Sequence, residues 1–299
     1  MFVIAGATGN TGGVVASTLL AQGKPVTVLV RDASKGESWR EKGAQVATAS
    51  LEDTHAVAQA LAGAEGAYLL IPPDYKTEDA LGYGFRVSEA LAGAVKTSGI
   101  PHVVLLSSVG AQHADGTGPI RSLHHAESVL WPAAKNLTVI RAAYFLQNWS
   151  GSVDGVRKQG ALHNFLAPER KIPMVSTTDI GKIAAGYLAD PARGRRVVEL
   201  AGPEDYSPQD IARIFAAALG KPVKLETHSL DAVIPSMTAA GFPQDLARLF
   251  REMIEGINSG HVAYEGKGAT FERGTVTAQE AINQILGLSA ATRSGGGQA

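Results

Sequence analysis

The sequence predicts an α/β protein with a doubly wound parallel sheet, and three observations support this fold class. Helical segments such as 54–61 and 85–98 separate short apolar runs, an alternation typical of strands that pair in parallel. A glycine-rich turn joins the first of these runs directly to a helix expected at 14–22. The apolar runs have the length and composition of buried strands, and they lie at 2–5, 26–30, 45–48, 67–71, 102–107 and 137–141.

The turn after the first strand carries glycine at positions 6, 9 and 12. Glycine at these places lets the chain turn tightly, lets the backbone approach a ligand closely and lets the next helix pack on the strand. Free N–H groups at the start of that helix face the negative charge of a pyrophosphate. Because a second strand follows the helix, we interpret the turn as a Rossmann-type dinucleotide-binding loop rather than a simple connection. The residues expected to bind the cofactor here are Gly6, Thr8, Gly9, Asn10, Thr11 and Gly12.

Composition excludes several classes of protein. With 299 residues, of which 45% are hydrophobic and 18% charged, the chain is long enough for one large α/β domain with a smaller appendage. A net charge of -1 gives no basic surface for nucleic acid or an anionic membrane, and the absence of cysteine excludes disulfides and cysteine nucleophiles. The apolar runs are too short to span a bilayer, and no basic leader precedes the first strand. We therefore expect a cytoplasmic protein.

The pattern changes at about residue 150. Residues 1–150 are expected to form the NAD(P)-binding domain, and residues 151–290 a smaller, partly helical lobe that covers the substrate. Residues 176–200 are expected to return to the main sheet, and the polar, glycine-rich residues 291–299 predict a disordered tail. Ligands of such sheets bind at the carboxyl ends of the strands, so the loops that follow the strands should carry the site.

The end of the second strand indicates which dinucleotide binds. Arg31 follows this strand directly, and a cation there favours the 2′-phosphate of NADP, with Lys35 as a second charge within reach. Asp32 keeps NAD open, since it is either the acidic residue that binds the ribose hydroxyls or a turn cap. After the third strand, Leu51 is expected to border the adenine, and Asp53 to cap the next helix.

Common catalytic signatures are missing. Short-chain dehydrogenases reduce carbonyls with a tyrosine followed four positions later by a lysine that lowers the tyrosine pKa, and no tyrosine of this chain has such a lysine. Nucleophile-elbow, HExxH and P-loop motifs are also absent. Ser107 and Ser108 still end the fifth strand, where the serine of that family's site lies, so the scaffold remains without its usual acid.

The polar cluster of His124, His125 and Glu127 is the main remaining candidate for acid–base chemistry. His124 and Glu127 are spaced to share one helix face. Both histidines are candidate catalytic residues, as proton donors or substrate contacts, and the alternative is an exposed helix start. A metal site would need further ligands that this spacing does not supply, so no metal is expected. Beyond the sixth strand, Tyr144 and Phe145 are placed to flank a nicotinamide or a flat substrate, with core packing as the alternative. Tyr144 is the third candidate catalytic residue.

Motifs along nearly the whole chain together resemble the NmrA-like group of atypical short-chain dehydrogenases, in particular its type 2 quinone oxidoreductases and triphenylmethane reductases. Their order and spacing are more specific than any one motif. They lie at 6–12, 70–73, 106–110, 141–149, 178–180, 200–204 and 271–277.

The resemblance implies that residues 6–12 bind the pyrophosphate and that Arg31 contacts the 2′-phosphate or the adenine. It also implies nicotinamide-side contacts from Pro72, Ser107 and Tyr144. The family contains both reductases and regulators that bind dinucleotide without turnover, so the fold does not settle the activity.

One position departs from the family pattern. Some members carry a lysine four residues before the glutamate that corresponds to Glu127, and this chain has Leu123 there. A mechanism that needs that lysine is therefore not expected.

The leading hypothesis is an NAD(P)H-dependent oxidoreductase that transfers hydride to a quinone or a similar flat conjugated acceptor. Hydride addition to a quinone gives a stabilised phenolate that water or a nearby histidine can protonate, so the Tyr and Lys pair is dispensable. The alternatives are an NADP-binding redox sensor without turnover, and a tailoring enzyme that acts on polycyclic aromatic natural products. The expected partner is a small aromatic or quinone substrate, without nucleic acid or membrane, and a homodimer stays open.

Overall fold

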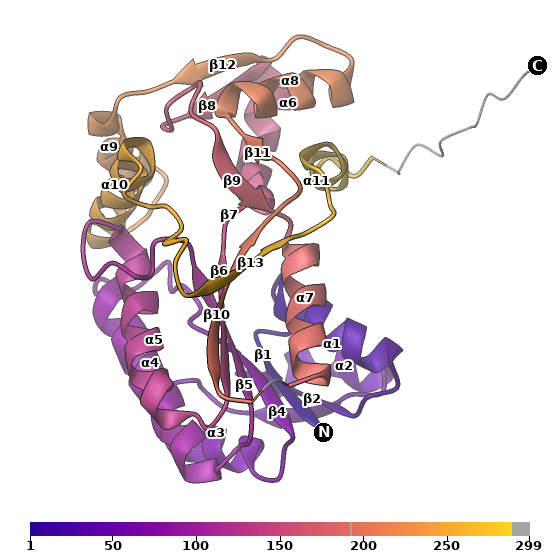
Figure 1. Ribbon diagram of the computed structural model, residues 1–299. Helices are drawn as coiled ribbons and strands as arrows, with labels where there is room; N and C mark the ends of the chain where they lie inside the picture. Colours follow the sequence, from indigo (N-terminus) through magenta and orange to yellow (C-terminus); the bar gives the residue numbers. More distant parts are fainter. Residues whose placement is uncertain (192, 289–299) are drawn as a thin grey trace, which may run out of the picture.

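The computed structural model describes residues 1–191 and 193–288 (Figure 1). Its main sheet has eight strands, and every neighbouring pair in it is parallel. The predicted fold class, a doubly wound α/β protein of the Rossmann type, is confirmed. Strand order reverses between β1 and β4, which is where such sheets bind ligands. Across the sheet the strands are β13 (Ala269–Arg273), β10 (Arg195–Ala201), β6 (Leu137–Ala142), β5 (Val103–Ser108), β4 (Gly66–Leu70), β1 (Phe2–Ala5), β2 (Val26–Val30) and β3 (Gln45–Thr48).

Helices cover both faces of this sheet, because its central strands are apolar on both sides. On one face lie α3 (Thr54–Leu61), α4 (Ala80–Ser98) and α5 (Arg121–Ala133), which enclose one core with the sheet. On the other face lie α1 (Gly12–Ala21), α2 (Glu37–Glu41) and α7 (Thr177–Ala189), which enclose a second core. Short 3₁₀ turns, η1 (Ala33–Gly36) and η2 (Gly118–Ile120), precede α2 and α5.

A smaller lobe begins at the carboxyl end of β6, since β7 (Tyr144–Phe145) follows that strand after one residue. Figure 1 shows it above the main sheet. The lobe has an apolar core of its own. Its strands form two small sheets, β11 (Asp205–Tyr206) with β9 (Ile172–Val175) and β7, and β12 (Lys224–Thr227) with β8 (Ala161–Asn164). Its helical segments are η3 (Leu146–Ser152), α6 (Val153–Gln159), α8 (Pro208–Leu219), η4 (Leu230–Ala232), α9 (Val233–Ala239), α10 (Gln244–Ser259) and α11 (Ala278–Ile285).

The expected domain boundary at residue 150 stays a prediction. Beyond residue 150 the chain leaves the lobe and returns to the main sheet more than once. β10 joins the main sheet beside β6. β13 joins it beside β10, at residues 269–273, where we expected only the lobe. Asp179 in the first turn of α7 connects these parts, because its carboxylate accepts a 2.9 Å hydrogen bond from the N–H of Val276. The expected tail at 291–299 lies outside the described residues. No described helix combines the length and apolarity that a membrane span requires.

Candidate active site

The glycine loop between β1 and α1 is fixed by close packing. Gly6 has a φ of +64°, a left-handed conformation that L side chains rarely adopt. A Cβ atom at Gly6 would lie 2.7 Å from a methyl group of Leu70. At Gly12 it would lie 2.5 Å from the carbonyl oxygens of both Ala5 and Gly6. The loop therefore holds its shape only with glycine at these two positions.

Tyr68 of β4 fixes the end of the same loop. Its hydroxyl donates a 2.9 Å hydrogen bond to Oγ1 of Thr11, and burial raises the pKa of Tyr68, so the phenol stays neutral. The amide N–H groups of Asn10, Thr11 and Gly12 find no acceptor among the described residues. Thr8 and Asn10 are exposed on the outside of the loop. The start of α1 thus offers free donors to an anion.

The end of β2 presents positive charge. Arg31 and Lys35 are exposed, and the side chain of neither forms a hydrogen bond or ion pair with the residues that the structure describes. The carboxylate of Asp32 accepts a 2.9 Å hydrogen bond from the N–H of Ser34, which lowers the pKa of Asp32. Asp32 is therefore the cap of η1, the second of the two roles that its position allowed.

The loop after β3 contains the predicted helix cap. Asp53 accepts hydrogen bonds from the N–H groups of His55 and Ala56, both at 3.0 Å, and so caps α3. Leu51 is half-buried and packs against the core below α3 and α4. It lies in the loop expected to border the adenine, but its contact with a cofactor stays a prediction.

A small apolar cavity opens beside the loop after β4. Its volume is about 180 Å³. Pro72, expected on the nicotinamide side, lines it together with Tyr83 of α4, Leu123 of α5 and Leu246 of α10. The side chain of Leu123, at the position where some relatives of this group have lysine, thus makes the cavity more apolar.

A buried ionic network lies at the carboxyl ends of β5 and β6. Ser107 of β5 donates a 2.5 Å hydrogen bond to Oε1 of Glu127, which projects from α5. Arg141 of β6 binds both oxygens of the same carboxylate, with Nη2 at 2.7 Å from Oε2 and Nε at 3.0 Å from Oε1. Its Nη1 is 2.9 Å from Oε2 of Glu265, whose side chain is half exposed. Burial lowers the pKa of Arg141, but the hydrogen bonds to the two carboxylates outweigh it, so that the pKa is raised.

The neighbouring strand extends this row of polar side chains. Glu199 of β10 is paired with Arg141, which is in turn paired with Ser107. The buried carboxylate of Glu199 accepts hydrogen bonds from the N–H groups of Glu265, at 2.7 Å, and Gly266, at 3.2 Å. The loop before β13 is thereby fixed over the ends of β6 and β10. Arg141 lies in the family motif at 141–149 and Glu127 in the predicted polar cluster, but their pairing was not predicted, and neither were Glu199 and Glu265.

The two histidines of α5 have different surroundings. Nδ1 of His124 donates a 2.9 Å hydrogen bond to the carbonyl of Ala111, in the loop after β5, which leaves Nε2 as the acceptor of the neutral ring. His125 instead contacts α4, where Nε2 is 2.9 Å from a carboxylate oxygen of Glu89 and the ring packs against Phe85 at 4.6 Å. His124 therefore lies with the loop that follows β5, whereas His125 faces the neighbouring helix. A catalytic role for either residue stays a prediction.

Tyr144 lies in β7, where the chain enters the lobe. Burial raises the pKa of Tyr144 to about 12, while a hydrogen bond from Asn148 acts in the opposite direction. Its ring packs 5.9 Å from that of Trp149. The phenol therefore stays protonated at neutral pH and presents a flat, apolar face. Its predicted roles beside the nicotinamide and in catalysis are untested.

Comparison with known proteins decides the family. A model of the NmrA-like family matches residues 1–284. The chain belongs to the NmrA-like family. The resemblance inferred from the sequence motifs is thus confirmed.

Several known proteins are similar to this NmrA-like chain over most of its length. It is 26% identical to the NAD(P)H azoreductase of Xenophilus azovorans over 255 residues, which is 85% of this chain and 86% of that protein. The NADPH complex of a quinone oxidoreductase from Escherichia coli superposes with a TM-score of 0.80 at 22% identity, over 96% of this chain and all of the other. The NADP(H) complex of triphenylmethane reductase from Citrobacter also has a TM-score of 0.80, at 17% identity, over 95% of this chain and 100% of the other.

Proposed function

We propose that this protein is an NAD(P)H-dependent oxidoreductase that prefers NADP(H) and reduces a small, flat, conjugated acceptor such as a quinone. The observation that carries the proposal is the glycine loop, whose packing leaves no room for a Cβ atom at Gly12 and whose amides at Asn10, Thr11 and Gly12 find no acceptor among the described residues. Membership of a family that includes NAD(P)H-dependent reductases supports it.

The described residues suit both the pyrophosphate and the 2′-phosphate of a dinucleotide. The free N–H groups at the start of α1 suit the pyrophosphate, and the exposed Arg31 and Lys35 suit the 2′-phosphate. Asp32 is engaged in its own turn, which weakens the case for a ribose-binding acid and favours NADP over NAD. When bound, the reduced nicotinamide supplies a hydride.

The cavity beside Pro72 is the proposed acceptor site. Its volume of about 180 Å³ is smaller than the roughly 300–1,000 Å³ of pockets for drug-sized ligands. This favours a single-ring acceptor over the polycyclic aromatics considered from the sequence. An apolar lining, with Leu123 in place of a lysine, orients a flat ring but supplies no proton.

Proton supply matters little for such an acceptor. Two-electron reduction of a quinone by hydride gives a hydroquinone monoanion, and water supplies the proton. Nε2 of His124 is a candidate proton relay on α5, because Nδ1 of the same ring donates to the carbonyl of Ala111. Azo compounds and triphenylmethane dyes are alternative acceptors, because proteins with these activities are among the similar ones.

A steady-state assay tests the proposal. NADPH consumption is measured with single-ring quinones, polycyclic quinones, azo dyes and triphenylmethane dyes, and we expect the highest kcat/KM with a single-ring quinone. Leu123→Trp fills the cavity and should raise the acceptor KM several-fold while the Kd for NADPH is unchanged. Tyr75→Trp is the matched control, because Tyr75 is 51% exposed and lies outside the cavity lining.

Two results would contradict the proposal. NADPH binding without consumption across the whole panel would favour the redox sensor. Equal acceptor KM values for Leu123→Trp and Tyr75→Trp would place the acceptor elsewhere.

A further inference from the structure

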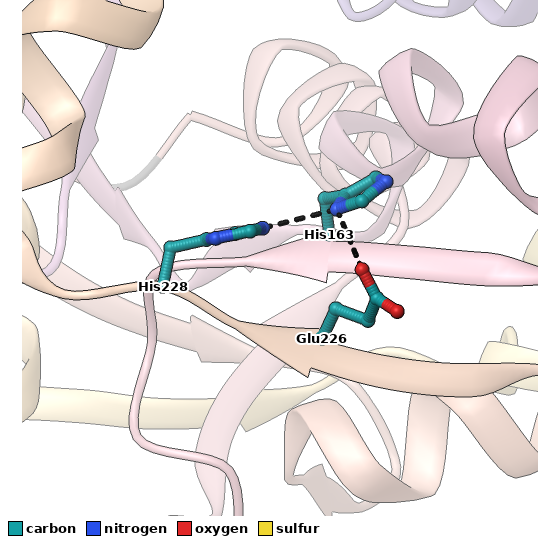
Figure 2. A group of neighbouring side chains, drawn as sticks. All are labelled: His163, Glu226 and His228. Atoms are coloured by element: carbon teal, nitrogen blue, oxygen red, sulfur yellow. Dashed lines mark hydrogen bonds and ion pairs between the residues drawn. The ribbon is translucent and has the colours of Figure 1, made fainter.

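A cluster of two histidines and one glutamate lies in the lobe, on the small sheet formed by β8 and β12 (Figure 2). His163 comes from β8, Glu226 from β12, and His228 directly follows β12. None of them belongs to the loops at the carboxyl ends of the main sheet.

The strand register explains why these side chains meet. His163 and Glu226 are directly paired across the two parallel strands. Because successive residues of a strand alternate between faces, His228 lies on the same face as Glu226. The N–H of His228 also donates a 2.8 Å hydrogen bond to the carbonyl of Asn164, which continues the ladder past the end of β12. Paired backbone therefore presents all three groups together.

The donor atoms have spacings that suit one metal ion. Nδ1 of His163 lies 3.0 Å from Nε2 of His228 and 3.5 Å from Oε2 of Glu226. Ligands of a tetrahedral zinc ion with bonds of about 2.0–2.1 Å are about 3.3 Å apart. All three donor atoms lie within 4.8 Å of one another, and the side chain of Glu226 is 35% exposed, so a small rotation closes the set.

Outer hydrogen bonds orient the same donors. Nε2 of His163 donates to Oε1 of Gln159 at 3.2 Å, which leaves the lone pair on Nδ1, the nitrogen that faces the other two groups. Lys224 binds the opposite oxygen of the glutamate, with Nζ 3.2 Å from Oε1, and leaves Oε2 toward the histidines. Metal-binding histidines and carboxylates usually have such partners.

We propose that His163, Glu226 and His228 bind one divalent transition-metal ion, with zinc as the best match. Two imidazoles are borderline ligands, so together with one carboxylate they suit zinc better than magnesium or calcium. The three protein ligands leave a coordination position for water at the exposed surface. The ion would join β8 to β12 and so stabilise the lobe, apart from the dinucleotide site.

Zinc binding to the chelator-treated full chain, free of any polyhistidine tag, tests this site by calorimetry. We expect one zinc ion per chain. Glu226→Gln keeps the size of the side chain and should weaken binding by about tenfold or more, and the double variant His163→Ala/His228→Ala should abolish it. Circular dichroism establishes that each variant is folded.

His55→Ala is the matched control. His55 is also exposed and also bonded to a glutamine, with Nε2 2.9 Å from Nε2 of Gln59, but it lies outside the cluster. Its removal should leave zinc affinity unchanged. As a second readout, zinc should raise the thermal midpoint of the wild type but not of the double variant. Undiminished zinc binding by the double variant, or equal loss in His55→Ala, would overturn the proposal.

Discussion

At the scale of single residues, Arg141 is the most constrained group near the site. Its guanidinium is buried and binds Glu127 through two nitrogens and Glu265 through a third. A buried charge is tolerated only when its hydrogen-bonding groups are satisfied. The two carboxylates are not equivalent, because Glu127 is buried and the side chain of Glu265 is 47% exposed.

Because the two carboxylates differ in burial, their removal should lower the free energy of unfolding by different amounts. Glu127→Ala should lower the free energy of unfolding by about 3–5 kcal/mol, because it leaves Arg141 buried beside an empty position. Glu265→Ala should cost less than about 1 kcal/mol, since water replaces an exposed partner. Urea denaturation measures both values. Equal costs would mean that Glu127 is not the principal partner of Arg141.

The exposed Arg31 gives a second prediction at this scale. Arg31→Glu should weaken NADP binding by roughly tenfold or more and NAD binding much less, because only NADP carries the 2′-phosphate. Fluorescence titration of the two dinucleotides measures the ratio of their Kd values. Equal losses for both would refute the role of Arg31 in selecting phosphate.

The sequence alone predicted single residues where chemistry and position coincide. Arg31 directly follows β2 and Asp53 directly precedes α3, so their places could be inferred from the chain. The Arg141 network could not, since Glu127 and Glu265 lie 14 and 124 residues away in sequence. Spacing on one helix associated Glu127 with His124, but the fold brings it to Arg141 instead.

At the scale of elements, different glycines of the β1–α1 loop serve ligand binding and folding stability. A Cβ atom at Gly9 would lie 3.3 Å from the carbonyl oxygen of Gly6, a tight contact that a small shift can relieve. At Gly12 it would lie 2.5 Å from two backbone oxygens that cannot move independently of β1. The two glycines therefore serve different purposes.

Two matched substitutions separate these purposes. Gly9→Ala should weaken dinucleotide binding with little change in thermal midpoint, because the added methyl group lies where the pyrophosphate approaches. Gly12→Ala should lower both the dinucleotide affinity and the thermal midpoint, since overpacking there costs roughly 1–3 kcal/mol. Calorimetric melting and NADPH titration are measured on both variants. Normal stability of Gly12→Ala would contradict the packing described here.

The elements that the sequence predicted well have a clear apolar pattern. β2 is buried at every position, and the predicted bounds of α3 match the structure. β13 was missed because it is an edge strand on which Phe271 is 50% exposed, so it lacks an apolar run. It joins the sheet through backbone pairing with β10, and such pairing cannot be inferred from the amino-acid composition of the strand.

At the scale of the whole molecule, acid stability depends partly on one buried histidine. His102 precedes β5 and is 2% exposed, and neither ring nitrogen has a hydrogen-bond partner among the described residues. Burial, with a smaller effect from Arg196, lowers the pKa of His102 from 6.5 to about 4. The native state therefore resists a proton that the unfolded chain accepts readily.

The sign of the pH effect follows from this difference. Above pH 6.5 the histidine is neutral in both states and contributes no pH dependence. Below it the unfolded chain binds the proton first, so stability falls as the pH drops toward 4, by roughly 2 kcal/mol between pH 7 and pH 5. His102→Leu should make this part of the pH profile shallower in urea denaturation. An unchanged slope would show that the pKa of His102 is the same in the native and unfolded states.

We propose that bound NADPH transfers hydride to an acceptor in the cavity between the loop after β4, helices α4 and α5, and α10 of the lobe. The most direct measurement mixes the protein–NADPH complex with a single-ring quinone under single-turnover conditions and follows the nicotinamide absorbance. The account predicts that the bound NADPH is oxidised, and that deuterium at the transferred position of the nicotinamide slows this step. Stable NADPH absorbance with every acceptor class, despite tight binding, would contradict the account.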